Sequence, residues 1–431
     1  MADRAWGFRT RALHAGGAPD PTTGARAVPI YQSTSFVFED TADAADLFAL
    51  QKYGTIYTRI SNPTTVAFEE RMASLEGGIG AVATASGQAA EFLTVTTLAG
   101  AGDHIVAAAN LYGGTHTQFD VTLRRLGIDT TFVTDATPER MAERITERTK
   151  LLYTETIGNP NGAVADLEAL ADVAHDARLP LVVDSTFATP WLCQPMSWGA
   201  DVVVHSATKF IGGHGTSIGG VIVEAGRFDW TASGRFPQMT EPIPSYNHLR
   251  WHDNFAEYAF CTKVRAEQLR DVGACLSPFN AFLFLQGLET LPFRMDAHVA
   301  NATAVADWLV QHPQVSWVSY AGLADSPWHA LAQKYLPRGA GAIFTFGVKG
   351  GRSAGARFID SLQLVSHLAN VGDARTLVIH PASTTHQQLS DEDLEASGVT
   401  SDMVRLSVGL EDLDDILWDL DQALAAAAKE A

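Results

Sequence analysis

LVVDST at residues 181–186 and VVVHSATK at residues 202–209 are two apolar runs that each end in polar residues. Each run has the length and the β-branched composition of a buried strand. About one strand–helix–strand repeat separates them, so we expect two neighbouring parallel strands. Asp184 and Lys209 should then lie close together, because the carboxyl ends of parallel strands meet at one edge of a sheet.

The same alternation of strand and helix extends outward in both directions along the chain. Further strand candidates are residues 81–85, 104–107, 130–133, 151–154 and 220–223, and helical patterns occupy residues 88–98, 115–126 and 167–177. Strands that alternate with helices at this spacing predict an α/β domain. Its sheet should be mostly parallel, contain about seven strands and be covered on both faces.

The rest of the pattern divides the chain into three parts. Residues 1–62 contain several Gly and Pro and little periodicity, which predicts an N-terminal arm contacting a neighbouring subunit; a disordered tail is the alternative. Asn62-Pro63 starts a helix and opens a large domain over residues 63–286, in which residues 227–256 form a long loop or insertion. Residues 287–431 form a smaller C-terminal α+β domain. Its expected helices are 294–312 and 413–428, and its expected strands are 315–320, 342–348 and 403–408.

The composition excludes several classes of protein. Of the 431 residues, 46% are hydrophobic and 18% are charged, which is typical of a folded soluble protein of two or three domains. The net charge of -19 disfavours nucleic acid as a partner, and no apolar run is long enough to cross a membrane. The sequence shows no secretory leader and only three cysteines, so we expect a cytoplasmic protein without disulfides.

Two candidate binding features follow predicted strands in the first half of the chain. Ser86-Gly87-Gln88 comes directly after the strand at 81–85 and opens a helix, so its backbone N–H groups could hold a phosphate. A purely structural turn is the alternative. Tyr112 follows the strand at 104–107 and could stack on a planar ligand, or simply pack.

Asp184 and Lys209 are the candidates with the most chemistry. A carboxylate at the end of a buried strand needs a partner, which could be a protonated ring nitrogen, a helix N-terminus or a buried cation. Lys209 follows Ser206 and Thr208 and precedes a glycine-rich stretch, which suits an amine held beside a phosphate for imine formation. A phosphate ligand or a surface lysine are the alternatives. Together, a phosphate cradle, a stacking ring, a carboxylate and a lysine predict a pyridoxal-phosphate site.

Four motifs at matching spacing carry a resemblance to a known family. They are Tyr57-Thr-Arg59, Ser86-Gly87-Gln88-Ala-Ala90, Asp184-Ser-Thr186 and His205-Ser-Ala-Thr-Lys209. In these motifs, and from Tyr57 to the last helix, the chain resembles the Cys/Met metabolism family of pyridoxal-phosphate enzymes. The resemblance implies an aspartate-aminotransferase-like fold of type I and pyridoxal 5'-phosphate as the cofactor.

The resemblance also implies a role for each residue of the site. Lys209 would carry the cofactor covalently, Tyr112 would stack on its ring, and Asp184 would keep the ring nitrogen protonated. Arg405 would bind the substrate carboxylate, with Tyr57 and Glu155 also near the substrate. Further cofactor contacts would come from Arg59, Ser86, Gly87, Gln88, Asn159, Thr186, Ser206 and Thr208. Because Tyr57 and Arg59 would reach the cofactor of a neighbouring subunit, a dimer would be the smallest active unit, and a homotetramer is expected.

Within the family, the resemblance is strongest to the O-acetylhomoserine sulfhydrylase branch. Gln88 stands where several sister enzymes have methionine, and Gly114 stands where methionine γ-lyases have cysteine. Residues 378–386 and the insertion are also similar to this branch. The implied activity is a γ-replacement in methionine biosynthesis, in which O-acetyl-L-homoserine and sulfide give L-homocysteine and acetate.

Several alternatives remain open at the level of sequence. They are a cystathionine γ-synthase, a methionine γ-lyase, a sulfhydrylase that uses O-acetylserine or methanethiol, and a cofactor-binding regulator without activity. His380 and His386 have no third ligand at a suitable spacing, so no metal site is expected.

Overall fold

A mostly parallel seven-stranded sheet forms the centre of the large domain, as predicted. The computed structural model describes residues 5–384 and 399–429. The strands are β1 Gly80–Thr84, β2 His104–Ala108, β3 Asp129–Val133, β4 Thr149–Glu155, β5 Leu181–Asp184, β6 Val202–Ser206 and β7 Gly220–Glu224. Their order is β1-β7-β6-β5-β4-β2-β3. Strand β7 alone is antiparallel to the other six strands, because it returns from β6 through a loop without a crossover helix.

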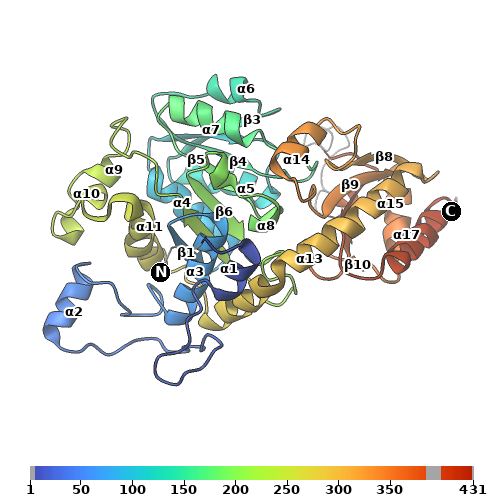
Figure 1. Cartoon of the computed structure of the whole chain (residues 1–431). Helices are drawn as coiled ribbons and strands as arrows, with labels where there is room; N and C mark the ends of the chain where they lie inside the picture. The colour runs from blue at the N-terminus through green and yellow to red at the C-terminus, as the bar shows by residue number, and fades with distance from the viewer. Residues whose placement is uncertain (1–4, 385–398, 430–431) are drawn as a thin grey trace.

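Helices cover both faces of this sheet (Figure 1). Alternate residues of β1 lie in two separate apolar layers: Val82 packs on one side and its neighbours Ala81 and Ala83 pack on the other. The principal covering helices are α3 Pro63–Glu76, α4 Gly87–Leu98 and α7 Leu167–Asp176. Burial on both faces explains why the central strands are uninterrupted apolar runs.

Shorter helical segments connect these elements. They are α5 Gly113–Thr117, η1 Gln118–Leu123, α6 Pro138–Ala142, α8 Thr189–Leu192, η2 Pro195–Trp198, α11 Ala259–Lys263, η5 Val264–Leu269 and α12 Arg270–Val272. No helix in the described part of the chain is long and apolar enough to span a membrane.

The C-terminal region is built on a second sheet of five strands, in the order β10-β11-β12-β9-β8. The strands are β8 Val315–Ser319, β9 Ile343–Val348, β10 Ser366–His367, β11 Leu377–Ile379 and β12 Met403–Ser407. Its helices are α14 His329–Tyr335, α15 Gly351–Ser361, η6 Pro381–Ser383 and α17 Leu413–Ala427. The 34-residue helix α13 Pro278–Gln311 connects the two regions and runs without a break across the predicted boundary at residue 287.

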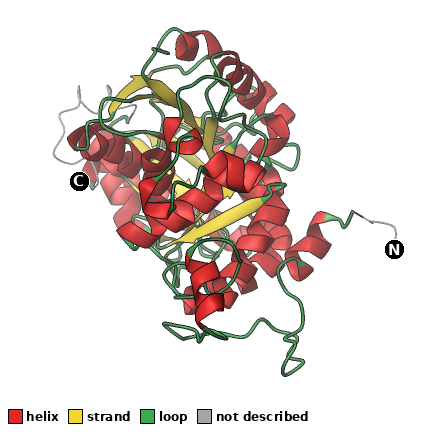
Figure 2. Ribbon diagram, turned by 90° about the vertical axis from the view of Figure 1, so that its left-hand side faces the viewer, coloured by secondary structure: helices red, strands yellow, loops and turns green. Residues whose placement is uncertain are grey.

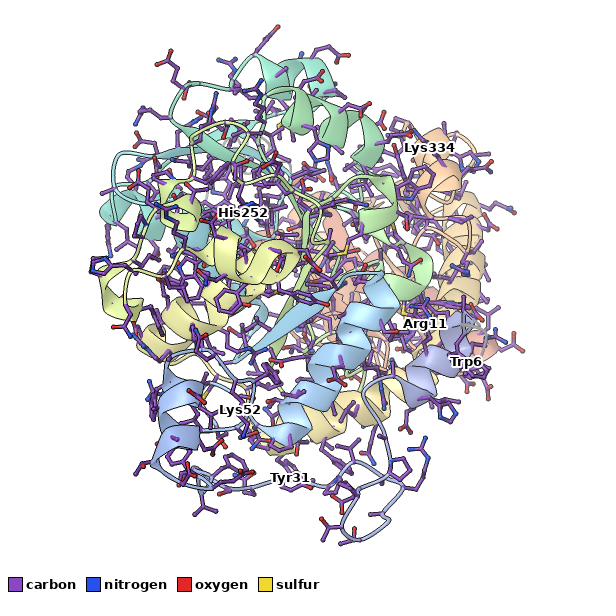
Figure 3. All side chains as sticks on the ribbon, turned by 60° about the vertical axis from the view of Figure 1, so that its left-hand side comes forward. Trp6, Arg11, Tyr31, Lys52, His252 and Lys334 are labelled. Carbon is purple, nitrogen blue, oxygen red and sulfur yellow. The ribbon has the colours of Figure 1, made fainter. Side chains whose placement is uncertain are left out.

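The N-terminal residues form an extended arm with two short helices, α1 Phe8–His14 and α2 Thr41–Phe48. Figure 2 shows that most of the arm is loop and that it extends below the body of the molecule. Tyr31 and Lys52 lie on this arm (Figure 3). Each contacts an acidic residue of the arm itself: the Tyr31 hydroxyl donates to Asp20 at 2.8 Å, and Lys52 pairs with Asp43 at 2.5 Å.

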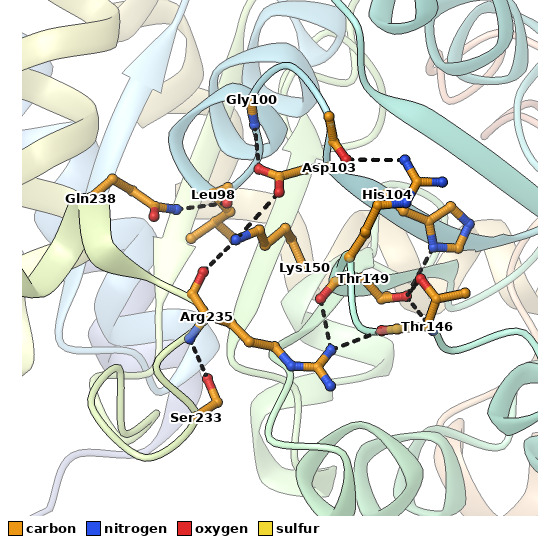
Figure 4. A network of polar contacts seen from close by, with 12 residues as sticks. Leu98, Gly100, Asp103, His104, Thr146, Thr149, Lys150, Ser233, Arg235 and Gln238 are labelled. Carbon is orange, nitrogen blue, oxygen red and sulfur yellow. Dashed lines mark hydrogen bonds and ion pairs between the residues drawn. The ribbon is translucent and has the colours of Figure 1, made fainter.

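The segment 227–256, expected as a loop or insertion, is folded and firmly attached. It contains the short helices α9 Pro237–Thr240, η3 Pro244–Tyr246 and α10 Trp251–Phe255, and η4 Ala256–Tyr258 follows. Trp230 stacks on Phe260, with ring centroids 5.9 Å apart. The Arg235 guanidinium donates to the carbonyls of Thr146 and Thr149 at 3.0 Å (Figure 4). These contacts hold the segment against the large domain.

Candidate active site

One cavity of about 240 Å³ collects almost all of the predicted site residues. It opens at the carboxyl ends of β4, β5 and β6, where ligands bind in parallel sheets. Twelve predicted residues line it: Ser86, Gly87, Gln88, Tyr112, Glu155, Asn159, Asp184, Thr186, Ser206, Thr208, Lys209 and Arg405. Neither Tyr57 nor Arg59 is among the described residues that line it.

The N-terminus of α4 forms one wall of the cavity. Ser86 is the N-cap residue, and its hydroxyl accepts the backbone N–H of Ala89 at 3.1 Å. The first backbone N–H groups of a helix have no intrahelical partners, so they are available to an anion. Gly87 allows this helix to approach β6, because a Cβ atom at residue 87 would lie 2.7 Å from the Cβ atom of Ser206. The arrangement can bind a phosphate group between α4 and the end of β6.

Hydroxyl groups after β5 and β6 form the opposite wall. The Thr186 hydroxyl accepts the backbone N–H of Ser206 at 2.8 Å, which ties the two strand ends together. The Thr208 hydroxyl exchanges hydrogen bonds with the backbone of Gly219 at 3.1–3.2 Å. Ser206 and Thr208 are therefore fixed at the rim of the cavity by neighbouring backbone.

Asp184 ends β5 beneath the cavity. Its Oδ1 atom accepts the backbone N–H of Thr186 at 2.8 Å. Burial raises the pKa of Asp184, and the hydrogen bonds from Thr186 oppose that rise. A carboxylate in this position would be stabilised by a cationic N–H group bound in the cavity.

Lys209 reaches the cavity from the loop after β6. Its Nζ atom donates to Oδ1 of Asn370 at 2.6 Å. The pKa of Lys209 is lowered to about 8, first by burial and then by the positive charge of Arg405. Near neutral pH a far larger share of this amine is neutral than of an exposed lysine, and a nucleophile or a general base requires the neutral form.

Tyr112 and Glu155 are connected through the backbone. Glu155 ends β4 and accepts the backbone N–H of Tyr112 at 2.6 Å. Burial raises the pKa of Glu155 well above its usual value, and the nearby Asp184 raises it further. Tyr112 is 49% exposed and lines the cavity. Its face is therefore available to a planar ligand.

Arg405 enters the cavity from the second sheet. It lies in β12 between Val404 and Leu406, which are fully buried, so alternation places it on the other face. Its Nη1 atom donates to Oδ1 of Asn159 at 3.3 Å. Within residues 5–384 and 399–429, Arg405 makes no ion pair with an acidic side chain. Its guanidinium is thus available to a carboxylate ligand.

Tyr57 and Arg59 lie elsewhere in the same chain. The guanidinium of Arg59 lies over the ring of Tyr57, 5.4 Å from its centroid, and donates to the carbonyl of Arg270. The predicted contact of these residues with a cofactor on a neighbouring subunit stays a prediction.

Sequence reasoning missed two polar residues of the cavity, Glu91 and Asn370. Asn370 lies in the loop between β10 and β11, which carries no recognisable pattern. Glu91 lies in α4 one turn after Gln88, so its helical spacing from the phosphate cradle was the available signal.

Of the two histidines considered as metal ligands, His380 lies within the described residues. The ring nitrogens of His380 contact the hydroxyl of Ser383 at 2.8 Å and the carbonyl of Ser401 at 3.0 Å. His386 lies outside the described residues. Across the described part of the chain, no three His, Cys, Asp or Glu side chains are grouped to hold a metal ion.

The residues of the cavity fit pyridoxal phosphate. Gly87 keeps open an anion cradle that a Cβ atom would fill, Tyr112 presents a ring face, and Asp184 is a half-buried carboxyl group whose ionised form a cationic N–H group would stabilise. With the amine of Lys209 in the same cavity, at the carboxyl edge of a mostly parallel sheet, these features define the fold type I pyridoxal-phosphate enzymes. The chain belongs to the family of Cys/Met metabolism PLP-dependent enzymes, which matches residues 9–425.

Known members of the family are similar over nearly the whole chain. The O-acetyl-L-homoserine sulfhydrylase 1 of Thermus thermophilus is 52% identical over 97% of this chain and all of its own length. The homocysteine synthase of Schizosaccharomyces pombe is 52% identical over 97% of this chain and 98% of its own. A crystal structure from Campylobacter jejuni, designated an O-acetylhomoserine (thiol)-lyase with a pyridoxyl-lysine phosphate, aligns with a TM-score of 0.94. It is 39% identical and covers 97% of this chain and 100% of its own.

Proposed function

We propose that this protein is an O-acetyl-L-homoserine sulfhydrylase, which converts O-acetyl-L-homoserine and sulfide to L-homocysteine and acetate. The observation that carries the proposal is the meeting of Lys209, Asp184 and Arg405 in one cavity. An amine, an electron-sink carboxylate and a carboxylate-binding guanidinium are the groups that chemistry on an α-amino acid needs. The Thermus and Schizosaccharomyces relatives support the choice of substrate through their names.

The residues that would hold the cofactor follow from the two walls of the cavity. Backbone N–H groups at Gly87 and Gln88, with Ser206 and Thr208, would bind the phosphate. Tyr112 would cover one face of the ring, and Asp184 would hold the proton on the ring nitrogen. Pyridoxal phosphate, when bound, supplies an aldehyde for amines and a ring that accepts electrons from Cα and Cβ of the substrate.

Lys209 and Arg405 would act on the substrate itself. The Arg405 guanidinium binds the α-carboxylate and fixes the orientation of Cα toward Lys209. Lys209, once its amine is free, accepts the Cα proton at Nζ, and a pKa of about 8 matches this task near neutral pH. Loss of acetate from Cγ and attack of sulfide at the same carbon complete the replacement. Sulfide supplies the sulfur atom and acetate is the leaving group, so the reaction needs no protein thiol.

We also propose a homotetramer built from catalytic dimers and a cytoplasmic location. The support for a shared site is that Tyr57 and Arg59 carry the family motif yet lie outside the cavity of their own chain. The extended arm that bears them offers a route to a neighbouring subunit.

The test is acetate release from O-acetyl-L-homoserine, measured with and without sulfide. The proposal expects acetate and homocysteine to appear together and only with sulfide. A γ-lyase would instead form an α-keto acid and ammonia without any thiol, and a cystathionine γ-synthase would require cysteine. Parallel assays with O-acetylserine and methanethiol determine the preferred acyl substrate and thiol.

A further inference from the structure

Helix α13 carries two buried polar side chains that the proposed reaction does not use, Arg294 and His298. They are four residues apart, so they project from the same face of the helix about one turn from each other. Neither is among the described residues that line the cavity. Each binds backbone of a different neighbouring segment, and these two segments carry the two basic residues of the site.

Arg294 holds the loop that carries Lys209. Its Nη1 atom donates to the carbonyl of Phe210 at 2.8 Å, and its Nη2 atom donates to the carbonyl of Ile211 at 3.2 Å. These are the first two residues after Lys209. Burial lowers the pKa of Arg294 to about 10, so the guanidinium remains charged near neutral pH and its hydrogen bonds are charge-assisted. Its planar set of donors fixes both the position and the orientation of the loop.

Gly213 makes room for this guanidinium. A Cβ atom at residue 213 would collide with Nη1 of Arg294. The backbone of Gly213 also has a φ of 71°, which favours glycine. The loop is therefore shaped around the guanidinium, and a displacement of one displaces the other.

His298 holds the end of β12. Its Nδ1 atom lies 2.7 Å from the carbonyl oxygen of Val408, the residue that follows β12. A carbonyl oxygen can only accept, so Nδ1 carries the proton and donates. Burial lowers the pKa of His298 to about 4, which keeps the ring neutral near neutral pH. Because Val408 comes three residues after Arg405, His298 determines where Arg405 lies.

The two segments also meet directly at the cavity. The Ser407 hydroxyl, at the end of β12, accepts the backbone N–H of Gly372 at 2.9 Å. A Cβ atom at residue 372 would lie 3.0 Å from the Cβ atom of Lys209, so this glycine packs closely on the lysine. Gly372 thus brings β12 and the Lys209 loop side by side, and α13 is bonded to both.

We propose that Arg294 and His298 are positioning residues that together set the separation between Lys209 and Arg405. Arg294 acts through the loop after Lys209, and His298 acts through the end of β12. Because both side chains belong to one continuous helix, they hold the loop and the strand at a fixed distance from each other. The proposal rests on the roles of Lys209 and Arg405 in the proposed function.

The two side chains should have different effects on the reaction. A shift of the loop misplaces Nζ of Lys209 relative to the Cα proton of a bound amino acid, which slows proton transfer. A shift of β12 misplaces the Arg405 guanidinium, which weakens binding of the carboxylate. Loss of Arg294 should thus lower a rate at saturation, and loss of His298 should lower an affinity. A purely structural role would lower stability without separating the two quantities.

The test uses glycine and methylamine, which differ by a carboxylate, on the cofactor-loaded full-length chain. Absorbance titration gives the affinity for each amine, and the ratio of the two affinities reports the contact between the carboxylate and Arg405. Exchange of the glycine Cα hydrogen in D₂O, followed by NMR at saturating glycine, reports proton transfer to Lys209. Neither measurement needs sulfide or O-acetyl-L-homoserine.

Arg294→Lys keeps the charge but loses the planar fork that binds two carbonyls. We expect the exchange rate at saturation to fall about 10- to 100-fold, as for a reacting group misplaced by up to about 1 Å. The ratio of affinities should stay unchanged. Gly213→Ala, which would push the guanidinium out of the loop, should have the same effect, and it serves as the second variant if Arg294→Lys does not fold.

His298→Phe keeps an aromatic ring against Phe210, where the centroids are now 5.1 Å apart, but loses the donor to Val408. We expect the glycine-to-methylamine ratio of affinities to fall about tenfold, because the guanidinium would lose part of its charge-assisted contact with the carboxylate. The exchange rate at saturation should change little. His298→Asn places an amide N–H group close to the position of Nδ1 and should restore the ratio. If His298→Phe does not fold, His298→Leu, which also lacks the donor, replaces it.

Arg71→Lys is the matched control. Arg71 is also buried and also donates to backbone carbonyls, those of Ala15 at 2.9 Å and Leu285 at 3.3 Å. Neither carbonyl belongs to the Lys209 loop or to β12. Arg71→Lys should therefore unfold at a lower temperature but keep the wild-type exchange rate and the wild-type ratio.

Two kinds of result would overturn the proposal. A wild-type exchange rate in Arg294→Lys and Gly213→Ala, or a wild-type ratio in His298→Phe, would mean that the side chain only stabilises the fold. Equal changes of rate and ratio in the Arg294 and His298 variants would mean a general loss of structure instead of two separate attachments. If the wild type itself does not exchange the glycine hydrogen, the role of Lys209 as a base fails, and with it the mechanism under the proposed function. Failure of the sulfhydrylase assay alone would leave the positioning of Lys209 and Arg405 intact.

Discussion

At the scale of single residues, the cavity places the Arg405 guanidinium where its charge alters the amine of Lys209. Burial lowers the pKa of both Lys209 and Arg405, and the Arg405 charge lowers the pKa of Lys209 further. The guanidinium remains charged at any physiological pH, so the amine is the group that gives up its proton. The pair can thus bind a substrate carboxylate with one group and accept a proton with the other.

Arg405 gives a first prediction about substrate capture. Arg405→Lys keeps the charge but loses the planar pair of donors, and Arg405→Ala loses both. Charge-assisted hydrogen bonds contribute roughly 1.5–3 kcal/mol, so the KM for O-acetyl-L-homoserine should rise about 10- to 150-fold. The KM for sulfide and the cofactor absorption spectrum should change little. Equal effects on both substrates in steady-state assays would show that Arg405 has a structural role instead.

Lys209 gives a prediction about pH. Addition of pyridoxal phosphate to the cofactor-free protein requires the neutral amine, which is scarce below a pKa of about 8 and predominant above it. The rate of addition, followed by absorbance, should therefore rise with pH and level off above about 8. Arg405→Gln removes a positive charge that lowers this pKa, so the midpoint should move to higher pH. Lys209→Ala should show no such addition, and an unchanged midpoint in Arg405→Gln would contradict the coupling.

Most residues of the site could be predicted from sequence, but two could not. Asp184 and Lys209 end or follow apolar runs, and a polar residue at that position is visible without a structure. Glu91 gives only the weaker signal of its helical spacing from Gln88, because an acidic residue in a helix is usually solvent-exposed. Asn370 contacts Lys209 from 161 positions along the chain, so only tertiary structure reveals it.

At the scale of elements, the N-terminus of α4 must approach β6 closely to form the phosphate cradle. We predict that Gly87→Ala weakens cofactor binding, because its Cβ atom would lie 2.7 Å from that of Ser206 and the helix must shift. Loss of one charge-assisted hydrogen bond corresponds to about 10- to 150-fold in the dissociation constant, measured by equilibrium dialysis. Gly100→Ala, just beyond the other end of α4, is the control, because nothing lies within 4 Å of its Cβ position. Equal affinities for the two variants would contradict the cradle.

Sequence predicted some strands and helices correctly and missed others, and the difference has physical causes. Apart from the edge strand β3, the strands of the large sheet are mostly buried, so they are distinct apolar runs that sequence reveals. The strands β10 and β11 have only two and three residues, which is too short for any periodicity. Helix α13 begins 16 residues before the expected start at residue 294, because Pro292 inside it interrupts the pattern.

At the scale of the whole molecule, residues from distant parts of the chain complete one cavity. The large sheet supplies Asp184 and Lys209, whereas Arg405 comes from the second sheet across the long helix α13. The relative position of the two regions therefore controls the separation between Lys209 and Arg405. Tyr57 and Arg59, on the extended arm, are the part of the predicted site that a single chain leaves outside the cavity.

The last prediction tests whether a neighbouring subunit supplies Arg59. Lys209→Ala and Arg59→Ala should each be inactive alone, the first for lack of the amine and the second for lack of a phosphate contact. In a mixed dimer, one site would combine Lys209 from one chain with Arg59 from the other, and the second site would lack both. Random exchange gives mixed dimers in about half of the population with one intact site in two, so about a quarter of wild-type activity should return.

The control for this experiment is a mixture of Lys209→Ala with Asp184→Ala. Both residues line the cavity of the same chain, so no combination of these two chains restores a complete site. Recovery only with Arg59→Ala would show that the site is shared across the subunit boundary. If subunit exchange is demonstrated by mass and activity stays absent in both mixtures, Arg59 acts within its own chain, where it contacts the carbonyl of Arg270. The arm would then stabilise the fold of its own subunit and not complete the site of another.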